Sequence, residues 1–330
     1  MIVASPDALF QSAFSRDISS LRTALQRASQ ELVTGRRSNI LASSRGNSEP
    51  LLRAQAALDN AEQARARLTV LEGRYRVASS ALRTIGELTE SVALAAQSAG
   101  DVNTGVQADA FASVEARSAI GTVFSALEAR FGGRALFGGT LGTGRVLADT
   151  SNFLADIQAL VPAGTSGAAA EAALNTYFQA GGAFETNIYE GGNQLDDPQL
   201  ADGSSIDALF TADSDELRSL YKGLAMVVVN EQVAEVDASN FLRRGAEVIQ
   251  GAREALVGQE ARMGLAQNAI TREQERQEQN GLDAELTLEA ALGRDPFEAA
   301  AETQALEARL QAAYTVTGRV GALRLANFLR

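Results

Sequence analysis

The stretch FSRDISSLRTALQRASQELVTGRR, residues 14–37, decides the fold class of this chain. Its apolar side chains recur at alternating steps of four and three residues, the spacing of a narrow stripe along one helix that packs against another. The members of this stripe are Phe14, Ile18, Leu21, Leu25, Ala28 and Leu32. The stripe ends at Thr34-Gly35, and the polar residues that follow predict a structured loop before the next helix.

The same spacing returns in the middle of the chain. Residues 50–99 predict one long helix with a stripe through Leu68, Leu71, Tyr75, Ala78, Leu82 and Ile85. The extra step of three from Ile85 to Leu88 predicts a local overwinding of that helix. A further helix is expected at about 107–131. Another helix is predicted to begin at Asp213 or Ser214. Further on, a repeat of seven residues through Leu242, Ile249, Leu256, Met263 and Ile270 predicts long helix.

The last helix is predicted to begin at Asp295-Pro296-Phe297-Glu298, where an acidic cap precedes proline at the first helical position. Its stripe runs through Leu306, Leu310, Ala313, Thr317 and Val320, and apolar residues continue at Leu323, Leu325 and Phe328. A narrow stripe cannot be buried by one helix alone, so the chain ends must pair with each other or with another chain. We favour contacts between molecules here, because each terminal stripe lies beyond a loop.

Composition excludes several classes of function. The 330 residues include no His and no Cys, which removes Ser-His and Cys-His triads and zinc sites built on those ligands. A net charge of −12 disfavours nucleic acid as a main partner. No apolar run approaches the ~20 residues that span a bilayer, so no membrane partner is expected. The first basic residue is Arg16, so the start of the chain does not resemble a cleavable signal peptide.

The expected fold is therefore mainly α. A long antiparallel helical coiled-coil bundle is built from both chain ends, with a small mixed α+β inserted domain between them. The glycine-rich stretch 132–144 predicts turns around a short strand at 135–137, and alternation at Phe184, Thr186 and Ile188 predicts another strand. The expected domains are residues 1–45 plus 295–330 as terminal assembly coils, 46–144 plus 215–294 as the long bundle, and 145–214 as the inserted domain.

Three groups of residues invite a chemical role. The glycines at 132–144 match neither phosphate-binding pattern, and Lys222, the single lysine, lies far from them, so a structural turn is the favoured interpretation. Asp196-Asp197 and the pair Asp213 and Asp215 suit loop and helix-cap positions better than acid–base chemistry or calcium binding. Arg36-Arg37 suits equally a contact to an acidic partner surface and a solvated loop.

Taken together, these motifs resemble the bacterial flagellin superfamily. ELVTGRR at 31–37 is similar to the signature that ends its first helix, with matches at Leu32, Thr34, Gly35 and Arg36, and 47–50 resembles the Asp-Asp-Pro that follows. GRALFGGT at 133–140 is similar to a segment of its hook–filament junction proteins, as is the ending RLANFLR. The matching residues of that segment are Gly133, Arg134, Leu136, Phe137, Gly138, Gly139 and Thr140.

The resemblance implies a non-enzymatic, extracellular structural protein of the flagellum, exported without a cleaved signal peptide and needing no cofactor or metal. It implies a junction between hook and filament that forms by coiled-coil self-assembly into a ring or tube. The implied partners are further copies of itself, the other hook-associated junction protein, flagellin and a type III export chaperone that covers the C-terminal stripe. Its assembly residues would be Phe14, Ile18, Leu21, Leu25, Leu32, Leu306, Leu310, Val320, Leu323 and Phe328.

Two alternatives stay open. A filament flagellin shares the terminal coils and is distinguished only by the 133–140 segment and the chain ending. A hydrolase or lyase with a carboxylate site in residues 145–214 is the alternative from another class, and calcium binding by that segment would be the observation in its favour.

Overall fold

The computed structural model describes the backbone of residues 6–38, 49–100 and 105–328, and the side-chain burial of residues 14–38, 49–100 and 108–319. These residues form two compact units. The first comprises residues 1–63 and 277–330, and the second comprises residues 64–276.

Helices dominate the described part of the chain. The elements in chain order are α1 (Pro6–Thr34), α3 (Glu49–Ala99), α4 (Gly105–Leu127), β1 (Arg130–Phe131), β2 (Arg134–Ala135), the 3-10 turn η1 (Gly139–Leu141), α5 (Thr150–Leu160), α6 (Gly167–Phe178), α7 (Ala183–Asn187), α8 (Asp215–Val229), the 3-10 turn η2 (Asn230–Gln232), α9 (Glu235–Leu292) and α10 (Pro296–Phe328). The fold is therefore mainly α, as the sequence predicts.

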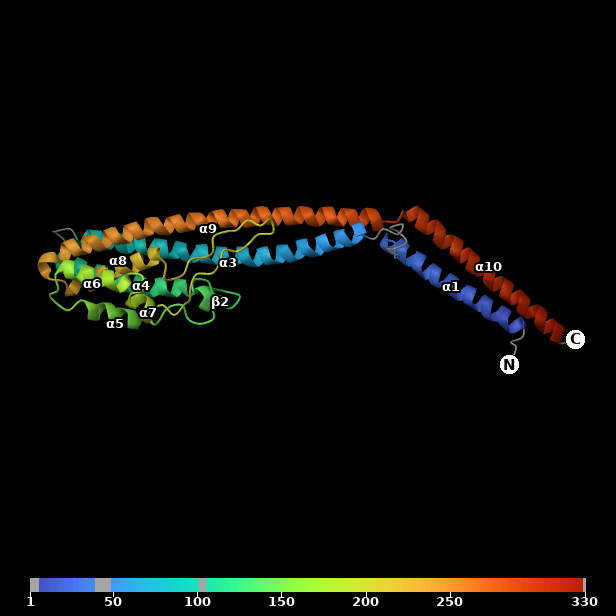
Figure 1. The fold of residues 1–330 in the computed structure, drawn as a ribbon, viewed down its shortest axis with the longest axis horizontal. Helices are drawn as coiled ribbons and strands as arrows, with labels where there is room; N and C mark the ends of the chain where they lie inside the picture. Colours follow the sequence, from blue (N-terminus) through green and yellow to red (C-terminus); the bar gives the residue numbers. More distant parts are fainter. Residues whose placement is uncertain (1–5, 39–48, 101–104, 329–330) are drawn as a thin grey trace. The chain divides into compact units, whose positions relative to one another are not determined.

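The first unit pairs the two ends of the chain. Helices α1 and α10 run antiparallel, side by side (Figure 1). In the same unit the beginning of α3 packs on the end of α9 through Leu51, Ala54 and Leu288. The predicted start of the last helix is confirmed, because the Phe297 amide donates to Asp295 Oδ1 at 2.8 Å and α10 begins at Pro296.

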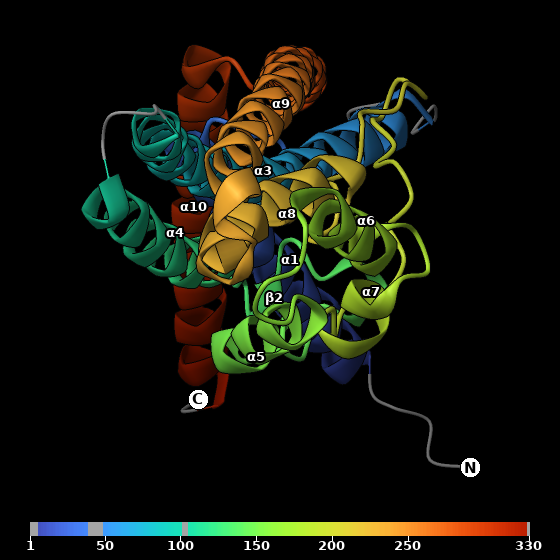
Figure 2. The ribbon, with the colours of Figure 1, turned by 90° about the vertical axis from the view of Figure 1, so that its left-hand side faces the viewer.

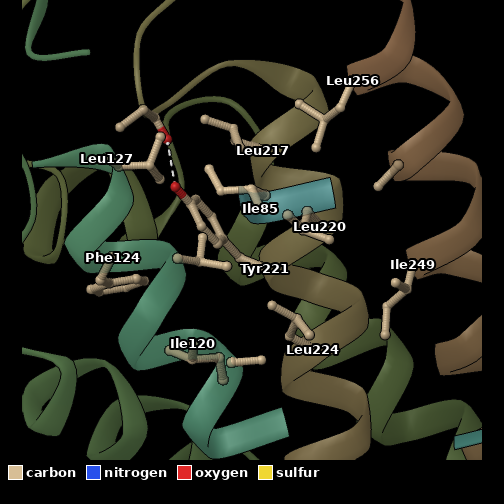
Figure 3. Packing of buried hydrophobic residues seen from close by; sticks show 14 of the residues in the cluster. Ile85, Ile120, Phe124, Leu127, Leu217, Leu220, Tyr221, Leu224, Ile249 and Leu256 are labelled. Carbon is tan, nitrogen blue, oxygen red and sulfur yellow. Dashed lines mark hydrogen bonds between the residues drawn. The ribbon is translucent and has the colours of Figure 1, made fainter. Parts of the chain in front are cut away.

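Helix α8 forms the centre of the second unit. It contacts α4 on one side and α6 on the other (Figure 2). Its Tyr221 is fully buried, and the side chain extends from α8 towards side chains of α4, among them Phe124 and Leu127 (Figure 3). The phenol hydroxyl donates to the carbonyl of Ala212 at 3.1 Å, so the one polar atom of this side chain is satisfied inside the core.

The stripe predicted on α3 is confirmed, since Leu68, Tyr75, Ala78, Leu82 and Ile85 are all buried. The step of three from Ile85 to Leu88, on which the predicted overwinding depends, is not followed by burial, because Leu88 is only half-buried. The next buried position is Thr89 rather than Leu88, which keeps the regular step of four. Thr89 reads as polar in the sequence, but its hydroxyl donates to the Ile85 carbonyl at 2.8 Å and therefore tolerates complete burial.

Two helices occupy the region 213–292. Helix α8 ends at Val229, and α9 begins at Glu235 after the turn η2. The intervening residues are fixed by contacts made across the chain: the Gly164 amide donates to the Gln232 carbonyl at 2.8 Å and the Ala234 amide to the Thr165 carbonyl at 2.9 Å. These long-range bonds leave no mark on the local sequence.

Residues 145–214, all described, contain helices as their regular elements, and the strand predicted at Phe184–Ile188 is wrong. That segment is α7 and the residue that follows it. Phe184 and Ile188 are four residues apart, a spacing that suits one helical turn as well as a strand, and both are buried while Thr186 is exposed. Helix α5 places Phe153 against Phe124 of α4, with ring centroids 5.2 Å apart, so this segment shares the main core.

The short strand expected at 135–137 is shorter and begins one residue earlier. Strand β2 (Arg134–Ala135) pairs antiparallel with β1 (Arg130–Phe131) across Gly132 and Gly133, whose φ angles are 58° and 82°. Leu136 and Phe137 leave the ladder and enter the core, where both are buried. Glycine is needed at this turn because other residues adopt positive φ only with strain.

Buried tyrosines make stability sensitive to alkaline pH. Burial raises the pKa of Tyr75 to about 12 and that of Tyr189 to about 12, and it also raises the pKa values of Tyr177 and Tyr221. An unfolded tyrosine ionises near pH 10, so the neutral form is favoured in the folded state. We expect the free energy of unfolding to be unaffected by these groups below about pH 10 and to fall as the pH rises from about 10 towards 12.

Urea unfolding measured at a series of pH values tests this expectation. Tyr75→Phe removes one of the titrating phenols, so its stability should depend less steeply on pH in that window. A stability that is independent of pH up to about 12 would contradict the assigned burial effect.

Candidate assembly interface

The seam between α1 and α10 holds most of the predicted assembly residues whose side chains the structure describes. On α1, Phe14, Ile18, Leu21 and Leu25 are half-buried. On α10, Leu306 is buried and Leu310 is half-buried. Val320, Leu323 and Phe328 belong to α10, but their side chains lie outside the described residues.

Two helices alone do not cover this seam. Small residues sit deepest in it, with Ala28 and Ala299 at 2 % and 1 % exposure, whereas the larger side chains on α1 keep part of their surface in solvent. Covering that remaining apolar surface would stabilise the contact by about 25 cal/mol for each Å² removed from water. The pairing of α1 with α10 therefore buries only part of the apolar surface of the two helices.

One predicted stripe position departs from the seam. Leu32 is 36 % exposed, and the acidic Glu31 next to it is buried at 5 % exposure. The burial pattern of α1 thus passes from Ala28 to Glu31, a step of three, instead of to Leu32. Leu32 stays a prediction as an assembly residue, because it does not lie in the seam that the chain forms with itself.

A polar contact joins the two helices farther along the seam. Arg22 Nε donates to the Tyr314 hydroxyl at 2.7 Å, and the guanidinium carbon lies 5.5 Å from the centre of the Tyr314 ring. Both residues are exposed, so the contact adds little stability. It marks which turn of α1 lies beside which turn of α10.

The motif Thr34-Gly35-Arg36 forms the turn that ends α1. Gly35 has a φ of 65°, the conformation that terminates many helices. The Arg294 amide donates to the Gly35 carbonyl at 2.9 Å, and the Arg37 amide donates to the Leu292 carbonyl at 2.7 Å. These two bonds tie the turn to the short link between α9 and α10.

A cluster of charged residues, which the sequence did not single out, lies beside this turn. The Glu31 carboxylate accepts hydrogen bonds from the Ser38 amide at 2.9 Å and the Ser38 hydroxyl at 2.6 Å. The Arg294 guanidinium pairs with both Glu31 and Glu302. In the sequence, Glu31 is next to the apolar stripe position Leu32 and is not recognisable as a buried residue. Its contacts form only when α1, the link after α9 and α10 come together.

The segment Gly133–Thr140 packs inside the second unit, and the positive φ angles of Gly133 and Gly139 give it the turns that the glycine-rich composition predicts. Leu136, Phe137, Gly138 and Gly139 are buried. The Thr140 amide donates to the Asn193 carbonyl at 2.9 Å, and the Gly192 amide donates to the Gly138 carbonyl at 3.0 Å. The segment therefore anchors the loop that follows α7.

Gly139→Ala should destabilise the fold by at least about 1 kcal/mol. Gly139 has a φ of 57°, and an added Cβ would lie 2.3 Å from the carbonyl oxygens of both Gly192 and Asn193. Gly144→Ala is the matched control, because its Cβ would meet nothing within 4 Å. Urea unfolding of both variants measures the difference, and equal midpoints would contradict the close approach seen at Gly139.

Three of the four carboxylates considered for chemistry, Asp197, Asp213 and Asp215, have structural partners. Arg218 pairs with Asp213 at 3.0 Å and also with Asp215. Burial raises the pKa of Asp213. Asp197 accepts a hydrogen bond from the Ala208 amide at 2.9 Å, which is a loop role. Within the described ranges, no three acidic residues come together in a group suited to a metal ion.

No helix of the described residues is both long enough and apolar enough to cross a membrane.

A scan against protein-family models gives no match for this sequence, and a search of curated proteins gives none either. Among solved structures, one described as a flagellar hook-associated protein from Vibrio parahaemolyticus aligns with a TM-score of 0.54 at 15 % identity, over 73 % of this chain and 95 % of that chain. Bacillus cereus FlgL aligns with a TM-score of 0.40 at 13 % identity, over 71 % of this chain and 93 % of that chain.

The chain shares the fold of the Vibrio protein over nearly the whole length of that protein. In this chain, that fold includes long helices, and the two end helices α1 and α10 pair with each other.

Proposed function

We propose that this chain is a structural component of the bacterial flagellum and that it forms the junction between hook and filament. The observation that carries the proposal is the pair α1 and α10, which presents a half-buried apolar seam made of both chain ends. The fold shared with a flagellar hook-associated protein supports the same role.

The assembly mechanism follows from the surface left on that seam. Phe14, Ile18, Leu21 and Leu25 keep apolar area in solvent when only α10 covers them. A neighbouring copy that packs its own terminal helices against this surface removes the area from water. Repetition of this contact around an axis gives a ring or tube. Each subunit then packs against one neighbour on either side.

The proposed partners are those of a junction between two tubes. One face of the ring would meet the other hook-associated junction protein, and the opposite face would meet flagellin. The protein would act outside the cell, after passage through the flagellar type III export apparatus. A chaperone that covers the apolar α10 would keep it from associating before export. The role is structural rather than enzymatic.

Deletion of the gene tests the proposal. A junction protein is required for flagellin to be retained, so the deletion strain should show hooks without filaments and unpolymerised flagellin in the medium. The alternative, a filament flagellin, predicts instead that the deletion removes flagellin from the medium as well. Normal filaments in the deletion strain would refute both interpretations, whatever the strain secretes.

A further inference from the structure

In the charged cluster of Glu31, Arg294 and Glu302, Glu31 and Arg294 are buried where an apolar contact would suffice for stability, while Glu302 is exposed. Glu31 is 5 % exposed, and the side chain of Arg294 is 11 % exposed. Taking two charges out of water costs free energy that their attraction repays only in part. The cluster therefore calls for a role other than adding stability.

The apolar seam alone does not define how α1 lies along α10. On α1, residues seven apart are all apolar, as in Phe14, Leu21 and Ala28. On α10, Ala299, Leu306 and Ala313 follow the same spacing. Sliding one helix by seven residues, about 10 Å, brings another small or apolar residue to most seam positions.

Chain connectivity does not remove this ambiguity. Helix α10 follows α9 after residues 293–295, but residues 35–48 separate α1 from α3. A connection of that length can in principle span such a shift, so something in the contact itself must select one alignment.

The charged cluster makes that selection. In the observed alignment, the Glu31 carboxylate meets Arg294 and also receives two hydrogen bonds from Ser38. A shift of seven residues would carry Glu31 past Arg294 and leave a buried carboxylate without its cation, which is strongly unfavourable. We propose that the Glu31–Arg294–Glu302 cluster specifies the register of α1 against α10, while the apolar seam supplies the pairing.

The absence of cysteine allows a direct measurement on the purified full-length chain. Cysteines placed at Arg22 and Tyr314, which are in contact, report the observed register. Cysteine at Arg22 combined with one at Glu307, or at Gly321, reports a shift of seven residues in either direction. The rates of cross-linking by a short bismaleimide are compared among the three pairs.

We expect the parent chain to cross-link the 22/314 pair at least about tenfold faster than either shifted pair. Glu31→Leu extends the apolar seam and leaves Arg294 paired with Glu302, so circular dichroism should show unchanged helix content. The ratio of the cross-linking rate of the 22/314 pair to that of the shifted pairs should nevertheless fall towards one. A role confined to stability would not change this ratio in a fully helical protein.

Asp17→Leu is the matched control, because it replaces an exposed acidic residue on the same helix and should keep the parent's preference. If Glu31→Leu loses helix content, Glu31→Gln carries the test by the same criterion. An undiminished preference in the helical variant, or a parent chain without preference, would overturn the inference. The test needs no assembly, so its outcome is separate from that of the flagellar proposal.

Discussion

Leu310→Asp is expected to abolish filament attachment in cells that carry this variant as their only copy. Leu310 is half-buried on α10, and the proposed assembly would bury the rest of it against a neighbouring copy. An unpaired charge in such a contact costs several kcal/mol, roughly the penalty of an isolated buried carboxylate. Because every subunit of the ring carries the same penalty, even a moderate cost for one contact prevents assembly.

The measurement is the number of filaments per cell by electron microscopy, with secreted variant protein quantified beside it. Arg309→Asp is the matched control, since residue 309 is exposed on the same turn and an exposed charge costs little. We expect the control to support filaments and both variants to be secreted in similar amounts. Normal filaments with Leu310→Asp would show that α10 is not an assembly seam.

Phe153→Ala is expected to lower the free energy of unfolding of the second unit by about 3–5 kcal/mol. The Phe153 ring of α5 is fully buried and lies 5.2 Å from the ring of Phe124 and 6.4 Å from that of Tyr221. Truncation leaves a cavity among aromatic rings that cannot collapse without moving three helices. The loss should therefore reach helices outside residues 145–214.

Differential scanning calorimetry combined with hydrogen exchange measures this effect. If residues 145–214 share one core with α4 and α8, Phe153→Ala should weaken protection in all three regions together. Phe111→Ala provides the control, because Phe111 is 66 % exposed and its truncation should change stability by less than about 0.5 kcal/mol. A loss of protection confined to residues 145–214 would instead establish that segment as an independent domain.

The spacing of apolar residues predicted the buried positions correctly wherever burial depends only on which face of a helix a residue occupies. The stripe from Leu68 to Ile85 and the capped start at Pro296 could be predicted because each depends on residues within a few positions of one another. Glycines at 132 and 133 likewise predicted a turn, since positive φ is a local property. These features define a mainly α chain before any long-range contact is known, but not whether its ends pair with each other or with another chain.

The spacing of apolar residues gave a wrong prediction where it fits both a helix and a strand, and where a buried polar residue has its hydrogen bond inside the fold. Phe184 and Ile188 are four residues apart, so alternation and a helical turn predict the same burial, and only the contacts around α7 distinguish them. Thr89 looked like a surface residue, yet its hydroxyl bonds to the preceding turn and allows full burial.

The sequence by itself determined which residues form the apolar faces of the long helices, because a helix repeats every 3.6 residues whatever surrounds it. Only the tertiary structure decided what those faces meet and in which alignment. Glu31 and Arg294 are 263 residues apart, and their pairing exists only after α1, α9 and α10 converge. The register of two helices and a buried ion pair both depend on distances between segments that are far apart in the sequence, and no local pattern encodes those distances.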